Sequence, residues 1–241
     1  MTHFTLPTDH AQATLIGRMW QPGLGATLVA VTASKVFDLS RLAPTCSALL
    51  EIPQAALQVR QAIATGQAQA LGDTAAVLNN SDETRRQADQ PWFMAPCDLQ
   101  AVKASGVTFV ASMLERVIEE QARGDASKAE AVRQAVVAVI GDNLRSVKPG
   151  SPESAKLKVV LLAQGMWSQY LEVGIGPDAE IFTKSQPMSA IGTGALAGIH
   201  PGSQWNNPEP EIVLAVNSRG EVVGASLGND VNLRDFEGRS A

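Results

Sequence analysis

Two glutamates stand two positions apart at the start of an apolar run close to the C-terminal end of the sequence. Glu209 and Glu211 open a segment that continues through five apolar residues to Val216. Successive side chains of a β-strand point to opposite faces, so both glutamates lie on one face of a strand predicted from Glu209 to Val216. A glycine-marked turn and a returning strand over residues 221–227 then place Asp230 beside the pair.

Three carboxylates gathered in this way favour a hard divalent cation. Mg2+, Mn2+ and Ca2+ prefer oxygen ligands, whereas soft metals prefer thiolates. Acidic residues at alternate strand positions can also form a solvated face without any ion. On spacing alone, both interpretations of Glu209, Glu211 and Asp230 stay open.

The residues around these carboxylates resemble the fumarylacetoacetate hydrolase superfamily. The shared pattern is E-x-E, an apolar strand and then G-N-D-x-x-x-R-D, with a phenylalanine-x-lysine element upstream; it corresponds here to residues 209–211, 228–235 and 182–184. The resemblance implies that Glu209, Glu211 and Asp230 bind Mg2+, with Mn2+ or Ca2+ as alternatives. It also implies that Arg234 and Asp235 brace the metal-binding residues from behind.

Residues 205–211 and 234–240 look most like one branch of that superfamily, the 2-keto-3-deoxy-pentonate dehydratases. The resemblance implies a Mg2+-dependent lyase that removes water from a 2-keto-3-deoxy sugar acid and yields α-ketoglutaric semialdehyde. In such chemistry a Lewis-acidic metal acidifies the hydrogens on C3 and stabilises the enolate, which expels the C4 hydroxyl by β-elimination. The alternative activity is hydrolysis of a C–C bond, or decarboxylation, in acylpyruvate-type 2-keto acids.

The choice between elimination and hydrolysis depends on one short segment. Hydrolases of the superfamily carry N-Y-x-x-H-x-x-E, and the corresponding positions here hold Ser112, Arg116 and Glu119. A guanidinium does not give up its proton in proteins, so Arg116 cannot replace the histidine that activates water. This departure favours elimination, with Glu119 or Glu115 as the base. The competing interpretation of both glutamates is a solvated helix face.

Lys184 is predicted to meet an anion. A lysine within an apolar segment would be costly on a buried strand unless it is paired, and the substrate carboxylate is a natural partner. The simpler alternative is a strand lysine whose ammonium reaches solvent. Gln186, Ser112 and Arg116 are further candidate substrate contacts, together with Ser189.

The predicted fold class is α+β. A small mixed N-terminal domain is expected over residues 1–95, followed over residues 96–241 by a fumarylacetoacetase-like β-roll catalytic domain with inserted helices. Periodicity predicts strands over residues 14–20, 26–32 and 35–39. It predicts helices over residues 44–51, 53–65, 107–123, 128–140 and 153–170, with Ser127 as the cap of the fourth.

The sequence stops at Ala241, before the position where members of the superfamily supply a catalytic lysine and the rest of the β-roll. We therefore expect a C-terminally truncated chain, which leaves two further alternatives open: an inactive member, or a part that needs a partner. Unpaired strand edges in an incomplete roll predict poor solubility.

Composition limits the remaining possibilities. The 241 residues are 45% hydrophobic and 18% charged, which is typical of a globular protein, and the net charge of −5 gives no reason to expect nucleic acid or an anionic membrane as a partner. Cys46 and Cys97 have neither metal-ligand spacing nor a disulfide framework. The absence of a signal-like N-terminus and of a long apolar run predicts a cytoplasmic protein. The resemblance to the superfamily also implies that the protein forms a homodimer.

Overall fold

The computed structural model describes residues 5–106, 117–140, 147–163, 165, 167, 169–178 and 180–237. The chain divides into two compact units, each of which draws on several segments. Unit 1 comprises Met1–Val102, Ser185–Ala197 and Ile212–Leu227, and unit 2 comprises Lys103–Lys184, Gly198–Glu211 and Gly228–Ala241. The mixed α+β content agrees with the predicted class. The predicted domain boundary between residues 95 and 96 stays a prediction.

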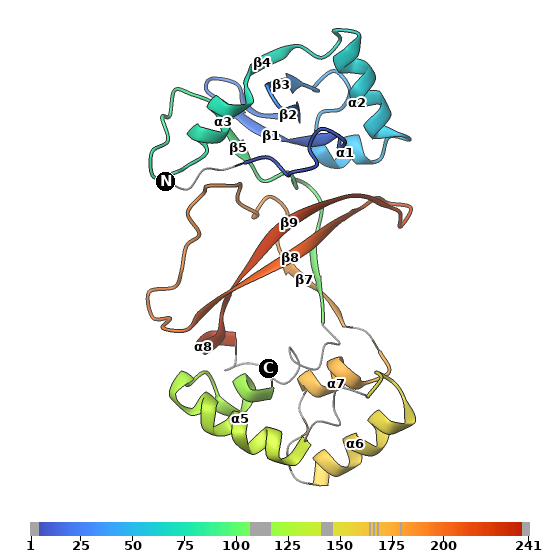
Figure 1. Ribbon diagram of the computed structural model, residues 1–241, viewed down its shortest axis with the longest axis vertical. Helices are drawn as coiled ribbons and strands as arrows, with labels where there is room; N and C mark the ends of the chain where they lie inside the picture. The colour runs from blue at the N-terminus through green and yellow to red at the C-terminus, as the bar shows by residue number, and fades with distance from the viewer. Residues whose placement is uncertain are drawn as a thin grey trace. The chain divides into compact units, whose positions relative to one another are not determined.

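Unit 1 is built on a five-stranded antiparallel sheet with the strand order β4-β3-β2-β1-β5 (Figure 1). Each of the first three strands lies within about a residue of its predicted position. The strands are β1 (Leu15–Gln21), β2 (Gly25–Val31), β3 (Lys35–Asp38), β4 (Ala70–Asp73) and β5 (Trp92–Met94).

Helices cover both faces of this sheet. Alternation along β2 sends Leu28 to the face covered by α1 (Cys46–Leu50) and α2 (Ala55–Ala64), where it packs with Leu49 and Val59. Val29 points to the opposite face and packs with Val77 of α3 (Thr74–Asn80). The predicted start of the second helix at Pro53 is wrong, because Gln54 precedes α2 in a left-handed conformation with φ 54°.

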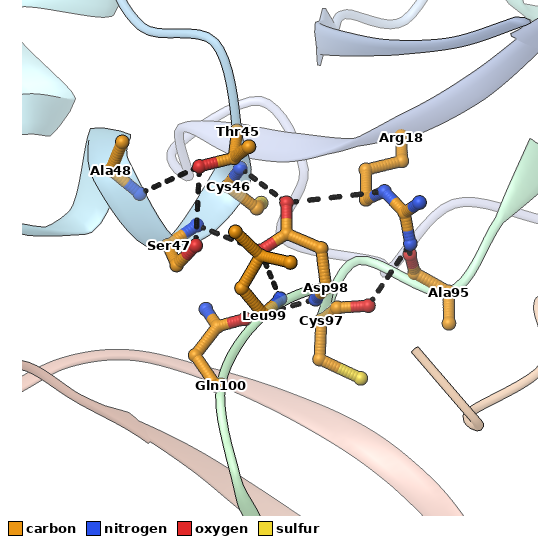
Figure 2. A network of polar contacts seen from close by, with 10 residues as sticks. All are labelled: Arg18, Thr45, Cys46, Ser47, Ala48, Ala95, Cys97, Asp98, Leu99 and Gln100. Carbon is orange, nitrogen blue, oxygen red and sulfur yellow. Dashed lines mark hydrogen bonds and ion pairs between the residues drawn. The ribbon is translucent and has the colours of Figure 1, made fainter. Parts of the chain in front are cut away.

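A buried carboxylate ties α1 to the segment that follows β5 (Figure 2). Asp98 accepts hydrogen bonds from the backbone N–H groups of Cys46 at 2.6 Å, Ser47 at 3.1 Å and Leu99 at 2.7 Å. The nearby thiol of Cys46 has its pKa raised to about 12, first by burial and then by the negative charge of Asp98. Both cysteines are free, as predicted. Burial and the neighbouring negative charge thus both disfavour the thiolate form of Cys46.

Unit 2 contains the inserted helices. Residues 117–122 are helical, as predicted, while residues 107–116 of that predicted helix lie outside the described residues. The predicted cap at Ser127 is wrong: α5 (Ala126–Ile140) starts before it, and both the backbone N–H and the hydroxyl of Ser127 donate to the Asp125 carboxylate, at 3.0 and 2.6 Å. The predicted single helix over 153–170 is two helices, α6 (Pro152–Ala163) and α7 (Gln169–Ile175).

The strands outside the five-stranded sheet form two pairs, β6 with β7 and β8 with β9. β6 (Val102–Ser105) and β7 (Ile181–Ser185) are short. β8 (Asn206–Val216) contains the predicted strand from Glu209, and β9 (Val222–Leu233) is longer than the predicted returning strand. Gly220, with φ 78°, donates its N–H to the Asn217 carbonyl at 3.0 Å in the predicted turn. Asp230 therefore lies within β9.

Among the described residues, every helix is too short or too polar to traverse a lipid bilayer.

Gly124 provides a test of the packing in unit 2. It has φ +74°, and a Cβ built there would collide with the carbonyl oxygen of Asp235. We expect Gly124→Ala to lower the free energy of unfolding by about 2 kcal/mol or more, because left-handed strain of about 1 kcal/mol adds to the collision. Gly165→Ala is the matched control, since Gly165 has φ +66° and no heavy atom of the described residues lies within 4 Å of such a Cβ. Equal costs in urea unfolding would contradict the close approach at Gly124.

Candidate metal centre

The three carboxylates that the sequence singled out converge in unit 2. Glu209 and Glu211 project from β8 and Asp230 from β9, and one carboxylate oxygen of each lies within 4.8 Å of those of the other two. Glu211 is exposed, whereas Glu209 and Asp230 are partly buried. The strand period of two places the glutamates together, and the returning strand supplies the aspartate. The role of the three as metal ligands stays a prediction.

The spacing of the oxygens fits a single hard cation. Two oxygens on opposite sides of one ion are separated by twice the metal–oxygen bond, about 4.2 Å for Mg2+ and about 5 Å for Ca2+. The observed limit of 4.8 Å is below the value for Ca2+ and above the value for Mg2+, so a Mg2+ ion would require the three oxygens to move slightly closer together. A donor set made only of carboxylates suits Mg2+, Mn2+ or Ca2+ and not a thiophilic metal.

Arg234 holds Glu209 from the side of α8 (Arg234–Glu237). Its Nη2 donates to Glu209 Oε1 at 2.7 Å, and its backbone N–H donates to the Trp205 carbonyl at 2.9 Å. A second ion pair joins the same guanidinium to Glu119. The arginine side chain is only 12% exposed, so it is fixed between two carboxylates.

Glu119 is buried, not solvated. It comes from the helical residues 117–122 and is only 3% exposed, so the alternative of a solvated helix face is wrong for this residue. Its ion pair with Arg234 connects it, through that guanidinium, to Glu209. Asp235, also predicted to brace the site, accepts hydrogen bonds from the Ser203 hydroxyl and the Gln204 N–H, both at 2.7 Å. The described contacts of Asp235 therefore order the segment that leads into β8.

Two cations among the described residues contact this cluster. Arg234 is paired with Glu209 and with Glu119, and Lys184 is paired with Asp230.

Lys184 meets an anion, but the anion belongs to the protein. Its Nζ lies 2.7 Å from Asp230 Oδ2. The strand is not buried, since Ile181–Lys184 of β7 are all exposed, and the lysine side chain itself is 31% exposed. The ammonium therefore sits against one of the three candidate metal ligands.

The remaining predicted contacts lie elsewhere or outside the described residues. Gln186 is exposed and belongs to unit 1. Its backbone carbonyl accepts hydrogen bonds from the N–H and the hydroxyl of Ser189. Ser112 and Arg116 lie outside the described residues. Sequence reasoning missed the pairing of Lys184 with Asp230 and of Arg234 with Glu119, because neither has a signal in the local pattern.

Comparison with known proteins identifies a shared segment. A Haloferax volcanii protein described as a probable 2-keto-3-deoxyxylonate dehydratase is 36% identical over 75 residues, which are 31% of this chain and 26% of that protein. A 2-dehydro-3-deoxy-D-arabinonate dehydratase from Saccharolobus solfataricus is 36% identical over 58 residues, which are 24% of this chain and 20% of the relative. Part of this chain is similar to sugar-acid dehydratases.

The similarity is limited in extent. The matched segments span only about a quarter and a fifth of the two relatives, as the 26% and 20% show. No family model matches the chain, and no solved structure matches it.

Proposed function

We propose that this protein is a divalent-metal-dependent dehydratase of a 2-keto-3-deoxy sugar acid, with a β-roll catalytic architecture of the fumarylacetoacetase type. The observation that carries the proposal is the convergence of Glu209, Glu211 and Asp230 within 4.8 Å. The partial similarity to two dehydratases of five-carbon 2-keto-3-deoxy acids supports the substrate class.

Each described residue of the cluster has a role in this proposal. Glu209, Glu211 and Asp230 hold the metal, and Arg234 keeps the Glu209 carboxylate in place through its 2.7 Å hydrogen bond. When bound, a divalent metal supplies Lewis-acid polarisation of a 2-keto acid, worth several kcal/mol in general. Lys184 provides a positive charge for the anionic end of the substrate.

The proton transfer falls to Glu119 in this proposal. Elimination of water requires a base to take one hydrogen from C3, while a double bond forms between C3 and C4 and the C4 hydroxyl leaves with a proton as water. The resulting 5-hydroxy-2-keto-3-enoate is an isomer of α-ketoglutaric semialdehyde. It becomes the semialdehyde when one hydrogen moves from C5 to C3 and the enol so formed transfers its hydroxyl proton to C4. Glu119 is a buried carboxylate connected to Glu209 through Arg234. The arginine fixes the direction of this carboxylate, as a positioned base requires.

The product separates the proposed reaction from its alternatives. We expect the protein with Mg2+ to convert 2-keto-3-deoxy-pentonate to α-ketoglutaric semialdehyde, detected by NMR and mass spectrometry, and we expect EDTA to abolish turnover. Both C4 epimers should be assayed beside an acylpyruvate. Release of pyruvate from the acylpyruvate, with no semialdehyde from either epimer, would overturn the proposal in favour of C–C hydrolysis. Semialdehyde formation that survives removal of divalent ions would exclude the metal.

A further inference from the structure

The ammonium of Lys184 occupies one side of the carboxylate cluster. Its Nζ lies 2.7 Å from Asp230 Oδ2, and Asp230 Oδ2 belongs to one of the three carboxylates that gather within 4.8 Å. Like charges at such distances repel strongly, so cations must lie between or beside them. Among the described residues, Lys184 lies at Asp230 and Arg234 lies at Glu209.

These two cations differ in how firmly they are held. Arg234 is 12% exposed, contacts Glu209 and Glu119 together, and is anchored by its backbone to Trp205. Lys184 is 31% exposed and stands on the exposed strand β7. A partly exposed lysine–carboxylate pair is weak and its four-carbon stem is flexible, so Lys184 is the cation that can leave.

The same ammonium also has an aromatic neighbour. Lys184 and Phe182 are two residues apart on β7, and Nζ lies 5.9 Å from the centroid of the Phe182 ring. That distance is within the range of a cation–π interaction. A small swing of the side chain away from Asp230 therefore keeps a favourable partner for the charge.

We propose that Lys184 is an internal counter-cation that competes with the divalent metal for Asp230. While Lys184 contacts Asp230, that carboxylate is only partly available as a ligand, and the ammonium is not available to a substrate. Once the metal binds, Lys184 is released and can contact the carboxylate of a 2-keto acid. The lysine thereby imposes an order in which the metal binds before the substrate. This inference rests on the proposed function, because it assumes a metal at the three carboxylates.

Metal affinity is the decisive measurement, and it needs no turnover. The signal of free Mn2+ in EPR titrations gives the dissociation constant for the wild type, for Lys184→Met and for Lys156→Met. We expect Lys184→Met to bind Mn2+ at least about fivefold more tightly, because the metal no longer has to break the ion pair between Lys184 and Asp230. Lys156 is an exposed lysine of α6, so its substitution makes the same change in net charge away from the cluster.

The possible results separate the two proposals. Mn2+ affinity of Lys184→Met that equals or falls below that of the wild type overturns the competition, while leaving metal binding intact. Equal tightening in Lys156→Met also overturns it, because the effect would then come from net charge. If none of the three proteins binds Mn2+, the proposed function itself fails and the competition fails with it.

Chemical labelling tests the ion pair, first in metal-free protein and then after metal is added. Acetylation of lysines, followed by peptide mass spectrometry, reports how accessible each amine is. We expect Lys184 to react several-fold faster in metal-free Asp230→Asn than in the wild type, and faster in the wild type after Mn2+ is added. Asp178→Asn, at an exposed aspartate of unit 2, should leave the reactivity of Lys184 unchanged. Unchanged reactivity in Asp230→Asn would overturn the pairing.

Discussion

Asp230→Asn is expected to lower the affinity for Mn2+ and the rate of semialdehyde formation at least about a hundredfold each. Asp230 is one of three carboxylates within 4.8 Å, and asparagine offers the cluster a neutral oxygen in place of a charged one. A hard divalent ion depends on charged oxygen ligands, and in the proposed reaction the barrier to elimination depends on that ion. EPR titration with Mn2+ and NMR assay of the product at saturating Mg2+ measure the two losses separately.

The matched control for this substitution is Asp178→Asn. Asp178 is an exposed aspartate of the same unit, so the chemical change is identical but falls outside β8 and β9 and outside the three-carboxylate cluster. Both variants should have circular dichroism spectra and urea midpoints close to those of the wild type. Wild-type Mn2+ affinity in a folded Asp230→Asn variant would show that Asp230 is not a ligand and would overturn the three-carboxylate site.

The position of the carboxylate cluster could be predicted because its logic is local. The two-residue period of a strand sets Glu209 and Glu211 on one face, and a glycine turn returns the chain so that Asp230 comes beside them. These relations depend only on residues within about one hairpin. The convergence of the three oxygens follows from them.

The partners of the cluster could not be predicted in the same way. Lys184 pairs with Asp230 and Glu119 pairs with Arg234 across long stretches of sequence. Only the tertiary fold determines which of many surface charges meet. The anion predicted for Lys184 was a substrate group, and within the described residues the contact is with Asp230 instead.

The prediction of helix boundaries was wrong where the local sequence signals did not decide between two positions. Asp125 and Ser127 are both good N-cap residues and stand two apart, so propensity does not rank them, and Asp125 is the one that accepts hydrogen bonds at the start of α5. The apolar pattern over 153–170 continues past Gly165, but α6 ends before this glycine, whose φ is +66°. Apolar periodicity reports a buried face and does not report where a helix stops.

Asp98→Ala is expected to lower the free energy of unfolding of unit 1 by about 3 kcal/mol, and by up to about 5 kcal/mol. Asp98 is only 4% exposed and accepts hydrogen bonds from three backbone N–H groups (Figure 2). Its carboxylate also lies 4.0 Å from Nε of the buried Arg18. The substitution therefore leaves three donors without an acceptor and a buried guanidinium without its counter-charge. Urea unfolding followed by circular dichroism measures the loss.

The pH dependence of this loss identifies its electrostatic part. Burial by itself raises the pKa of Asp98, but hydrogen bonds from Leu99, Ser47 and Cys46 outweigh it and hold the pKa below its usual value. A carboxyl with a lowered folded-state pKa adds stability that is fully present above its unfolded-state pKa of about 3.9 and disappears as pH falls through the folded-state value. The stability difference between the wild type and Asp98→Ala should therefore be constant from pH 7 to about pH 5 and shrink below about pH 4.

Asp89→Ala is the control for this pH series, because Asp89 is an exposed aspartate of the same unit. Its substitution should change the free energy of unfolding by less than about 0.5 kcal/mol at every pH. If the cost of Asp98→Ala stays the same from pH 7 to pH 3, the carboxylate charge does not stabilise α1 and Arg18, and the loss comes from packing alone. If instead the loss in free energy of unfolding becomes smaller at acid pH, the charge of the Asp98 carboxylate is what attaches α1 to the segment after β5.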